Sequence, residues 1–256
     1  MSALAARSDE RRAAPDVLEA VDVSKRFGGV DALKGVSLRL PQRAVIGLIG
    51  PNGSGKTTLL NCLSGTFAPT SGAIRVGCDS VAGLPANRVA RLGIVRTFQN
   101  IRLFRNLTAR QNVEISALAA GRIPRRRSRA HALELLDELG IAGLADRDAG
   151  TLSYGDQRRV EVARALAANP RFLLLDEPAA GMNDAESDEL RASIDRIRAD
   201  HGCGVLVVEH DLRLIMQLSE TIYVLNEGEL IATGTPDEVR TNPAVVTAYI
   251  GSEERS

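Results

Sequence analysis

One short segment of the chain has the residue types and spacing to hold the phosphates of a nucleotide. It runs Gly50-Pro51-Asn52-Gly53-Ser54-Gly55-Lys56-Thr57 and is followed by Thr58. The three glycines let the backbone turn its N–H groups toward a β-phosphate, while Lys56 reaches the β and γ oxygens and the Thr57 hydroxyl is placed to bind Mg²⁺. The pattern predicts a site for a nucleoside triphosphate and its magnesium ion, built from Gly50 to Thr58.

Two carboxylates, Asp176 and Glu177, directly follow the apolar run Phe172-Leu173-Leu174-Leu175. Such a run predicts a strand buried on both faces, so both acids stand at its carboxyl end, where open α/β sheets bind ligands. Alone, the pair could simply cap a loop. A phosphate-loop ATPase, however, needs a Mg²⁺ carboxylate on a second strand. We therefore expect Asp176 to hold Mg²⁺, directly or through water, and Glu177 to polarise the attacking water.

The elements that position these groups have the pattern of a parallel sheet with covering helices. The apolar run Ala44 to Ile49 predicts a buried strand before the phosphate loop, and Lys56 to Leu63 a helix after it. Arg171 to Leu175 and Gly204 to Val208 predict two more strands, with a helix from Glu186 to Arg198 between them.

Other stretches predict elements around this sheet. Val17 to Phe27 and Val36 to Leu40 read as strands of an opening antiparallel layer. Apolar residues at helical spacing predict two helices in the middle of the chain, one from Ala130 to Leu139 within residues 108–144 and one from Gly155 to about Ala168. Near the end, Thr221 to Thr233 predicts a hairpin that turns at Glu227-Gly228, and Pro236 to Ile250 predicts a helix.

Composition narrows the class of protein. The 256 residues carry no net charge, contain no tryptophan and have only 3% aromatic residues, which argues against a base-stacking surface, so we expect no nucleic-acid partner. The apolar stretches are far shorter than the ~20 residues that a spanning helix needs. Three widely spaced cysteines, Cys62, Cys78 and Cys203, fit packing roles in a reducing compartment. Residues 1–14 lack an apolar core and predict a disordered tail.

From about Val17 to Gly251 the chain resembles the ATP-binding cassette (ABC) ATPases. The segment Leu152-Ser153-Tyr154-Gly155-Asp156-Gln157 is similar to the family's LSGGQQ signature, with Tyr154 and Asp156 as departures. The resemblance implies that Ser153 and Gly155 contact the γ-phosphate of ATP bound to a second subunit in a head-to-tail dimer. From the residues alone, Ser153-x-x-Asp156 is a capping pattern, which favours a helix N-terminus here.

Four more residues match positions of the family. The resemblance implies that Gln99 links Mg²⁺ and the attacking water to the segment facing a membrane domain, that His210 contacts the γ-phosphate, and that Phe27 stacks on adenine. Asn183 stands where most of the family has aspartate. Without the resemblance, such a glutamine is usually a surface residue, such a histidine structural and such a phenylalanine part of the core.

The expected fold is therefore α/β: a phosphate-loop NTPase core with a mixed, mainly parallel sheet, an antiparallel β layer at the N-terminus and an inserted helical subdomain. We expect a disordered tail over 1–14, a single ATPase domain over 15–251 with the helical subdomain at about 100–168, and a tail over 252–256. The basic run Arg122 to Arg129 is either a solvated loop or a contact with lipid head groups or a partner.

Scattered stretches resemble the ATPase subunit of branched-chain amino-acid importers. They include Arg26 to Gly29, Arg96 to Phe104, and Gly234-Thr235-Pro236 leading to Ala248-Tyr249-Ile250-Gly251. The resemblance implies two membrane permeases, a second ATPase subunit (a paralogue or a second copy), an extracytoplasmic substrate-binding protein, and a location at the cytoplasmic face of the cell membrane. Alternatives are a urea or amide importer, a lipopolysaccharide exporter, a non-transport ABC ATPase, and a kinase or GTPase with a phosphate loop.

Overall fold

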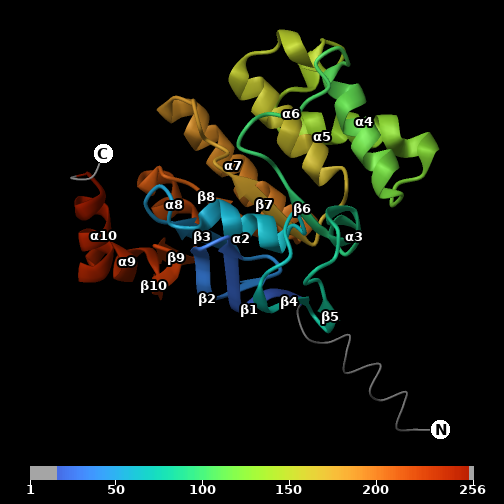
Figure 1. The fold of residues 1–256 in the computed structure, drawn as a ribbon. Helices are drawn as coiled ribbons and strands as arrows, with labels where there is room; N and C mark the ends of the chain where they lie inside the picture. The colour runs from blue at the N-terminus through green and yellow to red at the C-terminus, as the bar shows by residue number, and fades with distance from the viewer. Residues whose placement is uncertain (1–15, 254–256) are drawn as a thin grey trace, which may run out of the picture.

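The computed structural model describes residues 16–253, which form two sheets and a group of helices (Figure 1). The larger sheet has the strand order β10-β9-β3-β8-β7-β6 and is parallel except for the antiparallel pair β9 and β10. Its strands are β3 (Val45–Ile49), β6 (Ile94–Arg96), β7 (Phe172–Asp176), β8 (Gly204–Val208), β9 (Thr221–Asn226) and β10 (Glu229–Gly234). The predicted α/β fold with a mainly parallel sheet is confirmed.

The central strands have the composition of parallel strands that helices cover on both faces, with apolar residues throughout except Gly47 in β3, Asp176 in β7 and Gly204 in β8. All residues of β3, β7 and β8 are buried, as a strand covered on both faces requires. The C-terminal hairpin was also predicted, and its turn residues Glu227 and Gly228 have φ of 48° and 83°. Two successive positive φ values are what a two-residue type I′ turn needs.

The smaller sheet is antiparallel, with the order β2-β1-β4-β5. Its strands are β1 (Val17–Phe27), β2 (Val30–Pro41), β4 (Ser71–Val76) and β5 (Asp79–Ser80). The prediction of β1 is confirmed, whereas β2 begins well before the predicted Val36 and β4 and β5 were missed. Leu18, Leu38 and Leu40 from this sheet pack with Leu48 and Leu206 of the larger sheet in one buried cluster.

A group of helices lies apart from both sheets at the top of Figure 1. It contains α4 (Ala109–Ala120), α5 (Ser128–Glu138) and α6 (Tyr154–Leu166), with single 3₁₀ turns at Arg125–Arg127, Ala142–Leu144 and Ala149–Thr151. Their apolar faces meet in a buried cluster that includes Val113, Leu135 and Val160 and continues to Leu173 and Val207 of the larger sheet. These helices fall inside the range predicted for the helical subdomain.

The remaining helices cover the larger sheet or follow it. They are α2 (Lys56–Leu63), α3 (Ala86–Arg91), α7 (Asp184–His201), α8 (Leu212–Leu218), α9 (Pro236–Thr241) and α10 (Pro243–Glu253). The predicted tail helix is thus two helices, because the residue before Pro243 is pushed out of the helical region. Helix α7 is longer than predicted, since Asn183 and Glu186 form a capping box and Gly202 ends it in the left-handed conformation.

Some expectations need correction or fall outside the structure. Helix α10 ends at Glu253, so the predicted C-terminal tail over 252–256 begins inside it. The predicted N-terminal tail, residues 1–14, lies outside the described residues. Cys62 and Cys203 are buried as predicted, but Cys78 is exposed and is not a packing residue. No helix within residues 16–253 has the length and apolar character to cross a membrane.

Candidate functional site

The phosphate loop joins the carboxyl end of β3 to the start of α2, and its shape requires glycine at two positions. Gly50 has φ of 150° and Gly55 of 107°. A Cβ atom at Gly50 would lie 2.0 Å from the carbonyl oxygen of Leu225, and one at Gly55 would lie 2.7 Å from that of Ala32. Both neighbours are backbone atoms that cannot move aside, so no other residue fits either position.

The turn of the C-terminal hairpin is hydrogen-bonded to the phosphate loop. The N–H of Gly228 donates a hydrogen bond to the carbonyl oxygen of Ser54 (3.0 Å), and the carbonyl of Gly228 accepts one from the N–H of Lys34 (2.8 Å). Gly228 therefore joins the phosphate loop to β2. The sequence predicted this turn, but nothing in it indicated the contact with a loop so much earlier in the chain.

Lys56 folds back over the loop. Its Nζ donates hydrogen bonds to the carbonyl oxygens of Gly50 (2.6 Å) and Pro51 (2.9 Å), and the residue is buried. Burial lowers the pKa of Lys56, while the charges of Glu177 and Asp176 act in the opposite direction. The ammonium group is thus held at the loop, near both predicted carboxylates.

The residues of the loop fit a triphosphate. Ser54 Oγ is buried and has no hydrogen-bond partner among the described residues. Helix α2 begins at Gly55 with no side-chain cap and no acidic residue in its first turn, so its first N–H groups are available to an anion. Asn52, Gly53 and Thr57 are exposed beside them, and Thr58 is half-buried.

The same residues fit Mg²⁺ as the partner of a phosphate. The described part of the chain holds no group of three or more His, Cys, Asp or Glu side chains arranged for a metal. Mg²⁺ in nucleotide sites uses one or two carboxylates together with phosphate oxygens and water, so a cluster is not required. Asp176 and Thr57 offer the oxygen atoms that this mode needs.

Asp176 is buried at the end of β7, where an arginine neutralises it. Arg96 Nη2 donates to Asp176 Oδ2 at 2.6 Å, and Arg96 Nη1 donates to Asn61 Oδ1 at 2.6 Å. The side chains of Arg96 and Asp176 are only 5% and 4% exposed. Sequence reasoning missed Arg96 because it ends the short strand β6, which was also missed.

Gln99 and Glu177 are brought together. Gln99 Nε2 donates to Glu177 Oε2 at 2.8 Å. Glu177 has φ of 47°, and its N–H donates to the carbonyl oxygen of Val208 at 2.8 Å. A non-glycine residue in the left-handed region carries strain, and such residues cluster at functional sites. The strained turn aims the Glu177 carboxylate at the Gln99 amide rather than along the strand.

His210 follows β8 at the same edge of the sheet, and its side chain is 67% exposed. The preceding residue, Glu209, is buried and accepts hydrogen bonds from the N–H groups of Ala179 (2.7 Å) and His210 (3.2 Å). Burial raises the pKa of Glu209. Sequence reasoning missed Glu209, which ties the loop after β7 to the loop after β8 and thereby holds the backbone that presents His210.

The predicted capping role of the Ser153 segment is confirmed. Ser153 is the N-cap of α6: its Oγ accepts from the N–H of Asp156 (3.2 Å) and donates to Asp156 Oδ2 (2.7 Å). Ser153 and Tyr154 are exposed. Within residues 16–253 no hydrogen bond or ion pair joins Ser153 or Gly155 to the phosphate loop. One chain therefore does not bring these two groups of predicted site residues together.

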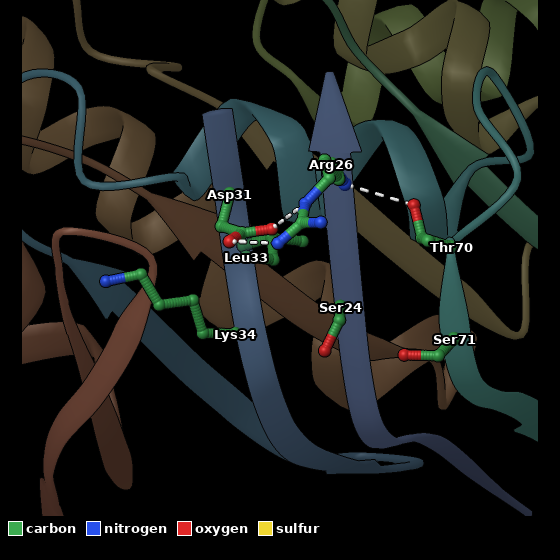
Figure 2. A pocket seen from close by; sticks show the side chains of 7 residues that line it. All are labelled: Ser24, Arg26, Asp31, Leu33, Lys34, Thr70 and Ser71. Atoms are coloured by element: carbon green, nitrogen blue, oxygen red, sulfur yellow. Dashed lines mark hydrogen bonds and ion pairs between the residues drawn. The ribbon is translucent and has the colours of Figure 1, made fainter. Parts of the chain in front are cut away.

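Phe27 ends β1 and is 42% exposed. Its ring meets that of Phe67 edge-on at 5.4 Å, with the Lys25 ammonium 5.0 Å from the Phe27 ring centre. An exposed ring face of this kind can stack on a base. An open pocket of about 520 Å³ lies across β1, β2 and the start of β4, as Figure 2 shows, and no predicted site residue lines it. Its lining is Ser24, Arg26, Asp31, Leu33, Lys34, Thr70 and Ser71.

Comparisons with known proteins agree on one family. Residues 33–180 match the model described as ABC transporter, and residues 229–255 match the one described as branched-chain amino acid ATP-binding cassette transporter. The chain is 43% identical over 249 residues to the high-affinity branched-chain amino acid transport ATP-binding protein BraF of Pseudomonas aeruginosa, covering 92% of this chain and 98% of that protein. It is 44% identical over 240 residues to LivG of Salmonella typhimurium, a protein of the same description (88% and 94% covered).

More distant relatives and solved structures extend the comparison. The lipopolysaccharide export system ATP-binding protein LptB of Escherichia coli is 36% identical over 238 residues, with 93% of this chain and 98% of that protein covered. The crystal structure of the ADP conformation of an ATP-binding cassette matches with a TM-score of 0.84 at 30% identity, covering 93% of this chain and all of that one. The dimeric structure of a bacterial ABC transporter cassette matches with a TM-score of 0.76 at 28% identity, with 86% and 98% covered.

Proposed function

Because this chain belongs to the ABC transporter family of ATP-hydrolysing cassettes, we propose that it is the ATPase subunit that powers branched-chain amino-acid uptake through separate permease subunits. The observation that carries the substrate class is the match of residues 229–255 to the branched-chain transporter model. The identities agree with it: 43% and 44% to branched-chain transport proteins, against 36% to a lipopolysaccharide export protein. These differences favour the importer over the exporter.

In this proposal the loop from Gly50 to Thr58 binds the phosphates of ATP, and Phe27 stacks on the adenine. Lys56 exchanges the carbonyl oxygens of Gly50 and Pro51 for phosphate oxygens, which are stronger acceptors because they are charged. Thr57, Asp176 and Gln99 would hold Mg²⁺, which would neutralise charge on the phosphates. Asp176 can share its carboxylate with the metal, because Arg96 donates to Oδ2 while Oδ1 accepts no side-chain hydrogen bond from residues 16–253.

Glu177 orients and polarises the water that attacks the γ-phosphate, and Gln99 fixes the Glu177 carboxylate through the 2.8 Å hydrogen bond. His210 contacts the γ-phosphate from the end of β8. Its exposure supports this role, because the only ion-pair contact of the imidazole within residues 16–253 is a long one, 3.7 Å from Nδ1 to Glu209 Oε2, and the ring can turn toward a ligand at the sheet edge.

Ser153 and Gly155 serve the nucleotide of a second ATPase subunit, a paralogue or another copy, in a head-to-tail dimer. The support is that Ser153 is exposed at the N-terminus of a helix, which favours an anion, and that in the described part of the chain no hydrogen bond links it to the chain's own phosphate loop. Two permeases and an extracytoplasmic binding protein complete the transporter, which places this chain at the cytoplasmic face of the membrane.

Reconstitution tests the substrate class. The chain is co-expressed with the permeases, binding protein and second ATPase encoded beside it, and the complex is placed in proteoliposomes loaded with MgATP. We expect ATP-dependent uptake of labelled leucine that stops with Lys56→Ala. Uptake of labelled urea without leucine would replace the proposed substrate with that of a urea importer.

A further inference from the structure

Side chains on one face of α6 donate hydrogen bonds to the backbone of the segment that carries Gln99. After Thr97, whose N–H makes a ladder bond to Leu174, the chain leaves the larger sheet and runs to α4 without regular structure. Arg158 and Arg164 of α6 bond to this stretch, and Glu161 lies between them in sequence and pairs with Arg158. We call Arg158, Glu161 and Arg164 the α6 clamp. Residues three apart on a helix are neighbours on its surface.

The hydrogen bonds from the clamp to the segment go to backbone carbonyl oxygens. Arg158 Nη1 donates to the carbonyl oxygen of Phe98 at 2.6 Å, and Arg158 Nη2 donates to that of Gln99. Arg164 donates to the carbonyl oxygen of Arg102. Two arginines of α6 therefore hold the backbone of this segment at both of its ends.

The clamp is buried and internally paired. Arg158 and Glu161 are each 2% exposed and lie 2.9 Å apart, Nη1 to Oε2. Burial raises the pKa of Glu161 and lowers that of Arg164, while each of these charges favours the charged form of the other. Buried charges of this kind depend on their partners, because removing one leaves the other uncompensated.

The clamp acts on the residue that touches Glu177. Gln99 is bonded at both ends: its carbonyl oxygen to Arg158 and its side-chain amide to Glu177 at 2.8 Å. Arg158 Nη2 also donates to the hydroxyl of Tyr154, at 3.3 Å, in the first residue of α6. One guanidinium thus joins the Gln99 backbone to the start of the helix capped by Ser153.

We propose that Arg158 is a positioning residue for ATP hydrolysis: it holds the Gln99 backbone so that the side-chain amide meets Glu177, and it makes this segment move with the N-terminus of α6. The proposal rests on the roles proposed above for Gln99 and Glu177. A displacement of about 1 Å at a reacting group is enough to slow a reaction by about 10²-fold.

The test uses Arg158→Lys in the full chain, because lysine keeps the charge but cannot bond both carbonyls as a planar fork does. A second variant, Arg158→Met with Glu161→Met, removes both charges and avoids an orphaned carboxylate. Arg159→Met is the matched control, since Arg159 is the next residue on the same helix and pairs with Glu189 instead. ATP turnover, MgATP affinity and amide hydrogen exchange of the peptide over 98–102 are measured.

For both Arg158 variants we expect kcat to fall about 10²-fold, little change in the Kd for MgATP, and faster exchange over 98–102 with unchanged exchange in β7. The Arg159→Met control should match the wild type in kcat, in the Kd for MgATP and in exchange over 98–102. If wild-type protein turns over and Arg158→Lys has the same kcat, the positioning role is wrong, whatever the exchange shows. If the wild-type chain hydrolyses no ATP together with the second ATPase subunit that completes its site, the proposed function is wrong. Unchanged exchange over 98–102 in the Arg158 variants would then still show that Arg158 does not hold this segment.

Discussion

Arg96 and Asp176 form an ion pair, 2.6 Å from Nη2 to Oδ2, that closes the carboxyl end of β7 against β6. Both side chains are buried, and Arg96 also donates to Asn61 on α2. The carboxylate proposed to hold Mg²⁺ is therefore neutralised by the protein itself. Binding of Mg²⁺ to Asp176 must therefore compete with the ion pair between Asp176 and Arg96.

Replacing Arg96 with Met should destabilise the nucleotide-free protein and strengthen its response to metal. Removal of one partner of a buried ion pair typically costs about 3–5 kcal/mol, because the remaining charge is uncompensated. We expect a lower unfolding temperature without ligand and a larger rise on adding MgATP, both measured by differential scanning calorimetry. Arg96→Lys is the control that keeps the charge. Equal MgATP-induced shifts in wild type and Arg96→Met would show that the pair does not oppose the metal.

Glu177→Gln should stop turnover while ATP binding continues. The amide cannot polarise water, yet its oxygen can still accept from Gln99, so the local geometry is kept. Loss of a general base lowers rates by about 10²–10⁴-fold. Phosphate release reports turnover, and sedimentation in the presence of ATP reports whether the dimer is trapped. Glu189→Gln, on the exposed side of α7, serves as the control; a Glu177→Gln chain with normal kcat would remove Glu177 from its role.

Two glycines of the phosphate loop should respond differently to alanine. At Gly50 the new Cβ would meet the Leu225 carbonyl oxygen at 2.0 Å, so we expect loss of folded protein or of more than about 3 kcal/mol of unfolding free energy. At Gly53 no atom lies within 4 Å, and only φ of 77° opposes the change, which costs about 1–2 kcal/mol. Urea unfolding compares the two, and similar values would contradict the clash.

The pair His201 and Glu138 should make stability depend on pH. His201 Nε2 lies 2.9 Å from Glu138 Oε2, which joins the end of α7 to the end of α5, and this hydrogen bond raises the pKa of His201 above 6.5. A raised pKa in the folded state means that the contribution is complete below about pH 6.5 and is lost as pH rises through the folded-state pKa.

Glu138→Gln removes the charge that holds the proton on His201. We expect the difference in unfolding free energy between wild type and Glu138→Gln to be largest at pH 5.5–6 and to shrink at higher pH, measured by urea unfolding at a series of pH values. Asp137→Asn, an exposed carboxylate next to Glu138 on α5, is the control. A difference that grows with pH would show that His201 is neutral in the folded protein.

The parts of this structure that were predictable from sequence are those with a local cause. Continuous apolar runs predicted β3, β7 and β8, and turn chemistry predicted the Glu227-Gly228 hairpin. The strand β6 and helix α3 are too short to show a periodicity, so they were missed. The Ser153 cap was also predicted, because its partner Asp156 is three residues away.

The contacts that arrange the site have no local cause. Arg96 is 80 residues from Asp176, and Arg158 is 60 from Phe98. Neither arginine differs in its sequence surroundings from an arginine on the surface. Such pairs become visible only when the sheet order places β6 beside β7 and packs α6 against the segment that follows.

The contact between Gly228 and Ser54 has a consequence for the order in which the protein is made. Strand β3, which carries the phosphate loop, pairs with β8 and β9, both encoded far downstream. Domains fold during synthesis as their parts emerge, but contacts between distant residues must wait for both partners. A growing chain that has not passed residue 228 cannot form the hydrogen bond from Gly228 that supports the phosphate loop at Ser54. The ability to bind ATP therefore arises late in translation.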